Sequence, residues 1–419
     1  MSRLIRLTLV FVILMAALPV LPAAAQSLPP PLPVGCNLAN HDGEQWLICV
    51  PGNWNGDLVI YAHGYVKPGP VEGIPWDQLV LPDGTNIPVI VTGLGYAFAT
   101  TSYSVNGLAV IQGIAEVSHL ATSFKTSHPE TNHTYLVGAS EGGLITALAV
   151  ERFPTVFSGG LATCGPVGDF RKQINYWSDF RVVFDYFFSF PPDVFPRWTQ
   201  TSIRIPPNVM AGWPALGVQI ANAVISKPHA TEQLLRVTNA PVDPTNSATV
   251  TETVLGLLWY NVFATNDGID KLGGNPFDNQ LRWYIGSDND LKLNRRAGGV
   301  ARFTANLAAL KNMAAYQTSG RLSVPLVTIH TTGDPIVPYW HEPLYRLKTL
   351  SSGNALLYSN IPILRYGHCN FRASEVLTAF ALLVLKVTGQ ELINAQRALP
   401  DAGAQAEFLR LAKEHGALR

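Results

Sequence analysis

Short apolar runs alternate along the chain with longer stretches in which apolar residues recur every three to four positions. The short runs are bounded by turn residues and predict buried strands, whereas the longer stretches predict amphipathic helices. This alternation is typical of an α/β fold with a mostly parallel central sheet and helices on both faces. Strands are predicted at 58–62, 96–101, 134–137, 157–164, 325–330 and 355–358, and helices at 107–127, 143–150 and 373–387.

The alternation breaks between residues 166 and 323. This segment holds 20 of the 41 aromatic residues and includes helical stretches such as 301–315. We expect an inserted, mainly helical cap over the active edge of the sheet, with most aromatic side chains filling the cap's own core. Some of them are expected to line an apolar substrate pocket. The candidates for substrate contact are Tyr103, Phe184, Phe187 and Phe188.

The first 25 residues have the pattern of a secretory signal peptide. Arg3 and Arg6 precede an apolar run at 7–20, and Ala23-Ala24-Ala25 provides a small-residue cleavage site. A membrane anchor is the alternative, but the run is short and is followed by Pro22. We expect cleavage after Ala25 and a mature protein that is exported, extracellular or periplasmic, without a membrane anchor.

The composition of the chain indicates a globular protein with a large core. Hydrophobic residues make up 47% of the sequence, charged residues 14%, and the formal net charge is zero. Without a basic face, nucleic acid is not an expected partner. The predicted organisation is a proline-rich tether and hairpin at 26–56 and a sheet-containing core at 57–165 and 324–419 around the cap. The oligomeric state stays open.

Four cysteines in an exported chain predict two disulfides. Three pairings are possible, and we favour Cys36 with Cys49, which flank a short polar stretch, and Cys164 with Cys369. None of the four has the spacing of metal ligands, so no metal site is predicted.

The sequence Gly138-Ala139-Ser140-Glu141-Gly142 stands between the predicted strand 134–137 and the predicted helix 143–150. A serine in this place, with glycine two positions away on each side, is typical of a nucleophile elbow. Glycine lets the neighbouring backbone pass close to the turn, and the helix start favours developing negative charge. The pentapeptide alone is weak evidence; the flanking strand and helix make Ser140 the candidate nucleophile.

A serine nucleophile needs a base, and the base needs an acid that fixes its tautomer. Asp334 follows the predicted strand 325–330, and His368 lies directly before the predicted helix 373–387. Asp334 could instead be only a turn residue beside a proline. His330 lies inside an apolar strand and is expected to be a hydrogen-bonded core residue. We interpret Asp334 as the acid and His368 as the base.

The oxyanion of the tetrahedral intermediate needs two donors. One is expected to be the backbone N–H of Glu141, directly after the serine. The other is expected from the loop His63-Gly64-Tyr65, most simply the N–H of Tyr65, with Gly64 beside it and His63 shaping the loop. The side chain of Glu141 has no assigned role at this point.

Taken together, these residues resemble the α/β-hydrolase superfamily, over about 57–165 and 324–389. The ordered set of His63-Gly64-Tyr65, the Ser140 pentapeptide, Gly333-Asp334 and Gly367-His368 carries the resemblance. The chain looks similar to secreted bacterial serine esterases and, in part, to the catalytic domains of prolyl-oligopeptidase-like enzymes. Tannase and feruloyl esterase relatives pair a cysteine after the histidine with one directly before the serine, where this chain has Ala139.

The resemblance implies a secreted serine hydrolase of carboxylic esters that needs no cofactor or metal. The aromatic cap favours hydrophobic or aromatic esters, as small molecules or polyesters. A peptidase of the prolyl-oligopeptidase or tripeptidyl type is one alternative, although fewer than 60 residues precede the strand at 58–62, where such enzymes usually carry a propeller. A hydrolase-fold binding protein without turnover is the other.

Overall fold

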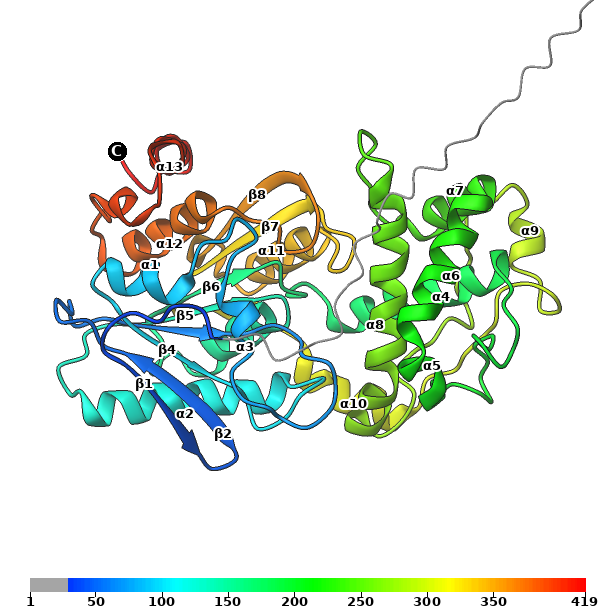
Figure 1. Cartoon of the computed structure of the whole chain (residues 1–419), viewed down its shortest axis with the longest axis horizontal. Helices are drawn as coiled ribbons and strands as arrows, with labels where there is room; N and C mark the ends of the chain where they lie inside the picture. Colours follow the sequence, from blue (N-terminus) through cyan, green and yellow to red (C-terminus); the bar gives the residue numbers. More distant parts are fainter. Residues whose placement is uncertain (1–28) are drawn as a thin grey trace, which may run out of the picture.

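The computed structural model describes residues 29–419. Within them, a sheet flanked by helices forms one part of the molecule, and helices inserted between two of its strands form the other (Figure 1). The predicted signal peptide at 1–25 lies outside the described residues.

One sheet of eight strands runs through the first part. The strands are β1 (Cys36–His41), β2 (Glu44–Cys49), β3 (Leu58–Ala62), β4 (Ala97–Thr101), β5 (Thr134–Ala139), β6 (Gly159–Thr163), β7 (Leu326–Gly333) and β8 (Tyr358–Tyr366). Their order is β1-β2-β4-β3-β5-β6-β7-β8; β2 is antiparallel to both neighbours, and all pairs from β4 to β8 are parallel. The predicted mostly parallel sheet is therefore confirmed.

Helices cover both faces of this sheet, which explains why β3, β4 and β6 are buried at every position. Alternate residues of β3 point to opposite faces of the sheet: Ile60 packs into the apolar cluster on one face and Val59 into the cluster on the other. The first side carries α2 (Val110–Ser127), α3 (Glu141–Arg152) and α11 (His341–Ser351), and the second carries α1 (Ile87–Gly93), α12 (Ala373–Thr388) and α13 (Ala402–Glu414).

The last strand departs from its predicted position. The prediction placed a strand at 355–358, but Ala355–Leu357 forms a short 3₁₀ helix and β8 follows it as a nine-residue strand. As the sheet's edge, β8 keeps exposed positions such as Leu364 and carries Pro362, so it lacks a continuous apolar run.

The cap lies between β6 and β7 and has an apolar core of its own. It comprises α4 (Phe170–Phe187), α5 (Pro207–Ala211), α6 (Trp213–Ser226), α7 (Pro228–Thr238), α8 (Ala248–Leu272), α9 (Asp290–Leu293) and α10 (Leu307–Met313). The helix predicted at 301–315 begins only at Leu307. Figure 1 shows α8 and α10 as the cap helices nearest the sheet, with α9 on the far side. Further 3₁₀ turns are η1 (Trp76–Leu79), η2 (Ala314–Tyr316) and η4 (Ala395–Ala398).

Two disulfides tie the core together. Cys36 is bonded to Cys49 across the β1–β2 hairpin, and Cys164, directly after β6, is bonded to Cys369, beyond β8. Disulfides of this kind are typical of oxidising compartments. Over the described range 29–419, no helix has the length and apolar character needed to span a bilayer.

Candidate active site

Ser140 occupies the sharp turn between β5 and α3. Its backbone has a positive φ of 57°, a conformation that non-glycine residues rarely adopt. The glycines beside it are required by space, because a Cβ on Gly138 would lie 2.1 Å from the carbonyl oxygen of Gly142. A Cβ on Gly142 would lie 1.9 Å from the carbonyl oxygen of Ala62 in β3. The turn is the nucleophile elbow that the sequence pattern indicates.

The structure brings the three candidate catalytic residues together. Nε2 of His368 lies 2.8 Å from Oγ of Ser140, and Nδ1 of His368 lies 2.7 Å from Oδ2 of Asp334. Asp334 is fully buried, whereas His368 remains partly exposed. In this geometry the imidazole can accept the serine proton on one nitrogen while the carboxylate accepts a hydrogen bond from the other.

Backbone groups and a second histidine hold the carboxylate of Asp334. Its Oδ1 accepts hydrogen bonds from the N–H groups of Ile336 and Val337, at 2.8 and 2.9 Å. Its Oδ2 lies 3.5 Å from Nε2 of the buried His330. Burial alone would raise the pKa of Asp334, but the charge of His368 and the hydrogen bonds of both histidines outweigh burial and lower it.

His330 is a buried, hydrogen-bonded residue beneath this acid. Its Nε2 donates to the carbonyl oxygen of Val337 at 2.7 Å, and its Nδ1 lies 2.9 Å from Oε1 of Glu342. Burial alone would lower the pKa of His330, but hydrogen bonds to Asp334 and Glu342 and their charges raise it to about 10. The side chain is therefore a cation at neutral pH.

The positions of these residues on the sheet identify the architecture. Ser140 follows β5, Asp334 follows β7 and His368 follows β8, so all three lie at the carboxyl edge of the parallel part of the sheet. The serine stands on a strand-to-helix elbow, and the chain order is Ser, Asp, His. The chain has the α/β-hydrolase fold.

Comparisons with known proteins give only distant structural matches. No family model and no curated protein matches the sequence. Among solved structures, an acylaminoacyl peptidase of Pyrococcus horikoshii has 11% identity and a TM-score of 0.40, over 87% of this chain and 44% of that one. Feruloyl esterase B from Aspergillus oryzae has 15% identity and a TM-score of 0.42, over 84% and 79%. An esterase of Pyrococcus furiosus has 9% identity and a TM-score of 0.41, over 94% and 99%.

These similarities are too distant to carry an argument about activity or substrate. The matched part also spans less than half of the acylaminoacyl peptidases' own length. Function in this α/β-hydrolase fold must therefore be argued from its own residues.

The candidate oxyanion donors lie on both sides of Ser140. Glu141 is the first residue of α3, where backbone N–H groups have no partner within the helix. The loop after β3 passes directly over the serine, since a Cβ on Gly64 would lie 3.2 Å from Cβ of Ser140. Gly64, placed beside these donors in the predicted oxyanion hole, does not supply one, because its N–H donates to Oε1 of Gln78 at 2.6 Å. Tyr65 and Glu141 remain as the candidates.

Contacts between His63 and Tyr103 stabilise this loop. Their rings stack at 3.9 Å, and the hydroxyl of Tyr103 donates to the carbonyl oxygen of His63 at 3.2 Å. Burial lowers the pKa of His63 to about 4, so it is neutral, with Nδ1 bonded to the carbonyl oxygen of Gly64 at 2.7 Å. Tyr103 is fully buried and does not line the cavity, so its predicted substrate contact is wrong.

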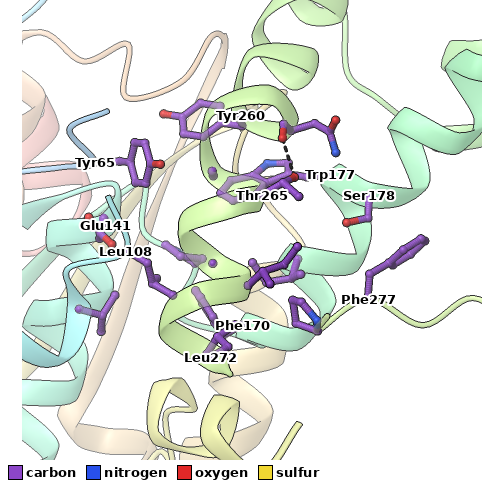
Figure 2. A pocket seen from close by; sticks show the side chains of 18 of the residues that line it. Tyr65, Leu108, Glu141, Phe170, Trp177, Ser178, Tyr260, Thr265, Leu272 and Phe277 are labelled. Atoms are coloured by element: carbon purple, nitrogen blue, oxygen red, sulfur yellow. Dashed lines mark hydrogen bonds between the residues drawn. The ribbon is translucent and has the colours of Figure 1, made fainter. Parts of the chain in front are cut away.

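A largely apolar cavity opens beside Ser140, between the core and the cap. Figure 2 shows Tyr65, Leu108 and Glu141 on the core side, facing Tyr260, Thr265 and Leu272 of α8. The remaining aromatic lining comes from Phe170, Trp177, Trp198 and Phe277. Because the lining is apolar and aromatic, the cavity suits a hydrophobic group attached to the reacting carbonyl.

The predicted aromatic contacts from α4 lie elsewhere. Phe184 and Phe188 stack on each other at 4.8 Å in the cap's own core, and Phe187 packs against Tyr186. Phe184 follows the cavity residue Trp177 by two helical turns, about 10 Å along the axis. The prediction therefore named residues at the C-terminal end of α4, whereas the N-terminal half of the helix lines the cavity.

The sequence did contain a signal for the true lining, on α8. Tyr260, Ala264, Gly268 and Leu272 recur every four residues and all line the cavity. A helix face that places two small residues between two large ones leaves room for a ligand. This signal was missed because α8 falls in the part of the cap without a clear alternation.

The side chain of Glu141 belongs to the cavity wall and is more than nine-tenths buried. Its Oε1 accepts the N–H of Ala109 at 2.9 Å, and Asp267 accepts the N–H of Leu108 at 2.7 Å while pairing with Lys271. The two carboxyls thus hold the start of α2. Burial raises the pKa of Glu141 to about 8, although Lys271 opposes the shift.

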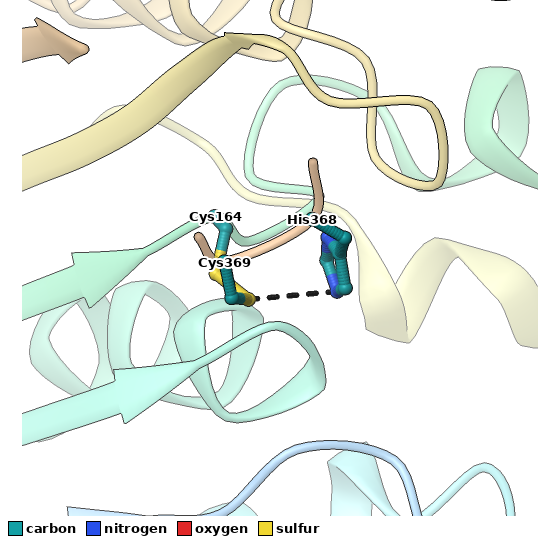
Figure 3. Close-up of side chains that lie close together, drawn as sticks. All are labelled: Cys164, His368 and Cys369. Carbon is teal, nitrogen blue, oxygen red and sulfur yellow. Dashed lines mark hydrogen bonds between the residues drawn. A yellow bond between two sulfur atoms is a disulfide. The ribbon is translucent and has the colours of Figure 1, made fainter. Parts of the chain in front are cut away.

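The disulfide between Cys164 and Cys369 lies next to the candidate base. Sγ of Cys369 is 3.5 Å from Nε2 of His368, and Figure 3 shows the bond beside the imidazole. The two sulfurs and His368 are close enough to resemble a metal site. Because both sulfurs are in the disulfide, neither is the thiolate that a metal ion requires. The bond instead ties the His368 loop to the end of β6.

Proposed function

We propose that the protein is a secreted serine hydrolase that cleaves carboxylic esters through an acyl-enzyme. The observation that carries the proposal is the chain of two contacts from Oγ of Ser140 through His368 to Asp334, at 2.8 and 2.7 Å. Secretion is supported by the signal-peptide pattern of residues 1–25 and by the two disulfides.

In this mechanism Ser140 attacks the ester carbonyl while Nε2 of His368 takes its proton. Asp334 orients the imidazole and stabilises the imidazolium. The backbone N–H groups of Glu141 and Tyr65 bind the oxyanion. His368 then protonates the leaving alcohol, and a water molecule activated by the same imidazole releases the acid.

The substrate class follows from the wall of the cavity. Its aromatic and aliphatic lining favours a hydrophobic or aromatic group on the ester, supplied by a small molecule or a polyester. Burial keeps Glu141 largely protonated at neutral pH, so it does not place a charge against such a group.

The test is hydrolysis of p-nitrophenyl esters, from acetate to palmitate, by the protein without its signal peptide. The Ser140→Ala variant should lose turnover of every ester. The matched control is Ser178→Ala, because Ser178 lines the same cavity from the cap and should be dispensable for attack. Turnover that survives in Ser140→Ala would refute the assignment of the nucleophile.

Proline-containing peptide anilides should be assayed beside the esters. Turnover of the anilides alone would favour the peptidase alternative. Binding of esters without turnover of either class would favour the binding-protein alternative.

A further inference from the structure

A second group of ligand-type side chains lies outside the Ser140 cavity, where the β1–β2 hairpin meets α2. One potential metal-binding atom from each of His41, Glu44 and His119 lies within 4.8 Å of the other two. None of these three residues lines the cavity described above.

The hairpin and the helix position the three residues independently. His41 ends β1 and is paired in register with Glu44, which begins β2. His119 comes from the middle of α2 and is exposed. The pairing of β1 with β2 brings His41 and Glu44 together. His119 comes close to them only because α2 packs against the hairpin.

Within the described part of the chain, His41 and Glu44 have few polar partners. Nδ1 of His41 is buried without a hydrogen bond, and the nearest carboxylate oxygen, Oδ2 of the exposed Asp42, is 3.7 Å away. Glu44 is 6% exposed and accepts a hydrogen bond from the hydroxyl of Thr101. Among residues 29–419, no lysine or arginine forms an ion pair with Glu44, although a buried carboxylate normally requires a cation.

A second carboxylate increases the negative charge. Glu116, one helical turn before His119, accepts hydrogen bonds from the N–H and hydroxyl of Ser104. Burial, and then the charge of Glu44, raise the pKa of Glu116. Within residues 29–419, neither Glu44 nor Glu116 forms an ion pair with a lysine or arginine.

Ring stacking explains where the imidazoles lie but gives Nδ1 of His41 no hydrogen-bond partner. His41 stacks on Trp46 at 4.0 Å, and His119 meets both rings edge-on, at 5.1 and 5.3 Å. Stacking restricts rotation of the His41 ring, so that its nitrogens keep fixed directions before any ligand binds.

We propose that His41, Glu44 and His119 bind a divalent transition-metal ion, with Zn²⁺ the best match to two imidazoles and one carboxylate. Ligand atoms bonded to one ion at about 2.0–2.2 Å lie closer to one another than the 4.8 Å limit that this cluster meets, and the exposed His119 can move to shorten the distances. The ion would neutralise Glu44, occupy an imidazole nitrogen and fasten the hairpin to α2. Sequence spacing did not indicate this site because its ligands come from a hairpin and a distant helix.

The test is zinc binding by the tag-free protein after removal of metal with a chelator. Isothermal titration with Zn²⁺ should show one site per chain, and zinc should raise the melting temperature. Affinity should fall below about pH 6, because protonated imidazoles do not bind metal. Cobalt(II) should give the visible absorption bands of a low-coordinate site with nitrogen and oxygen ligands.

Losing a residue that only supports a metal ligand lowers metal affinity by up to about 100-fold. Because His119 is itself a proposed ligand, His119→Ala should weaken zinc binding by more than that. Glu44→Gln keeps an acceptor for Thr101 and should also weaken it. The control is His229→Ala, since His229 is an exposed cap residue paired with Asp288. Wild-type protein that binds no zinc, or His119→Ala with wild-type affinity, would overturn the proposal.

Discussion

The indole N–H of Trp177, on cap helix α4, donates a 2.9 Å hydrogen bond to the carbonyl oxygen of Ile336, two residues after Asp334. The side-chain amide of Gln173 donates to the same oxygen at 2.8 Å. On its other side, the N–H of Ile336 donates to Oδ1 of Asp334. The cap therefore holds the Ile336 carbonyl group of the loop whose N–H groups orient the candidate acid.

Trp177→Phe should lower both stability and ester turnover. The variant loses one hydrogen bond, worth about 1 kcal/mol of unfolding free energy, while Gln173 still satisfies the carbonyl and preserves the fold. Urea unfolding and kcat for a p-nitrophenyl ester measure the two effects. Trp283→Phe, at a cap position that is 56% exposed, is the control and should change neither. Equal turnover in both variants would show that the Trp177 hydrogen bond does not position the acid loop.

Because His330 is buried and charged, we expect the free energy of unfolding to fall as pH rises. Its pKa is about 10 in the folded protein, above the ordinary value of 6.5, so its stabilising contribution is complete below pH 6.5. That contribution is lost as pH rises through 10, by roughly 3–5 kcal/mol at about 1.4 kcal/mol per pKa unit.

Chemical denaturation between pH 6.5 and 10 tests this prediction. The wild-type protein should lose stability over that interval, and His330→Asn should be less stable at pH 6.5 but change less with pH. His229→Asn, an exposed control, should follow the wild-type curve. A His330→Asn curve parallel to the wild type would contradict a charged imidazole at this place.

The parts of the site that are encoded locally could be predicted from the sequence. Gly138 and Gly142 flank Ser140 because any Cβ there would meet backbone, and such a requirement leaves a visible pattern. Asp334 could be placed because it follows a predicted strand, and parallel strands bring their carboxyl ends to one edge. His368 could be placed because it directly precedes a predicted helix.

The parts that depend on distant contacts could not be predicted. The N–H of Gly64 donates to Gln78, which lies in the 3₁₀ turn η1, and nothing in the sequence links these two positions. The bond from Trp177 to Ile336 joins positions 159 residues apart. Phe184 has the same side chain as the cavity residue Phe170, and only the packing of α4 separates their roles.

Glu141→Gln should remove a second source of pH dependence in the free energy of unfolding. The carboxyl has a pKa of about 8 against an ordinary value of 4.5, so wild-type stability should fall as pH rises from 4.5 through 8. Glutamine keeps an oxygen for the N–H of Ala109 but cannot ionise. The variant should match the wild type near pH 4 and exceed its unfolding free energy at pH 9.

Activity provides a separate measure of the same change. Ionisation of Glu141 above pH 8 places a charge in the apolar cavity, so KM for a long-chain ester should rise in the wild type and stay constant in Glu141→Gln. Glu232→Gln, on the exposed face of α7, is the control. If both variants follow the wild-type pH profile of KM, the Glu141 carboxyl does not face the substrate.

The two disulfides should have different effects on activity. Cys164–Cys369 closes a sequence separation of 205 residues beside His368, and Cys36–Cys49 closes one of 13 in the hairpin. In the chain-entropy model their removal costs about 5 and about 3 kcal/mol of unfolding free energy. Only the first holds the base loop, so only its loss should displace His368 from Ser140.

The paired variants Cys164→Ala/Cys369→Ala and Cys36→Ala/Cys49→Ala test this difference. Both should melt at lower temperature, but well below either melting point only the first should show a reduced kcat. The hairpin variant is the matched control, because it also lacks one disulfide. If the two variants retain the same kcat while folded, the Cys164–Cys369 bond stabilises the fold without positioning the base.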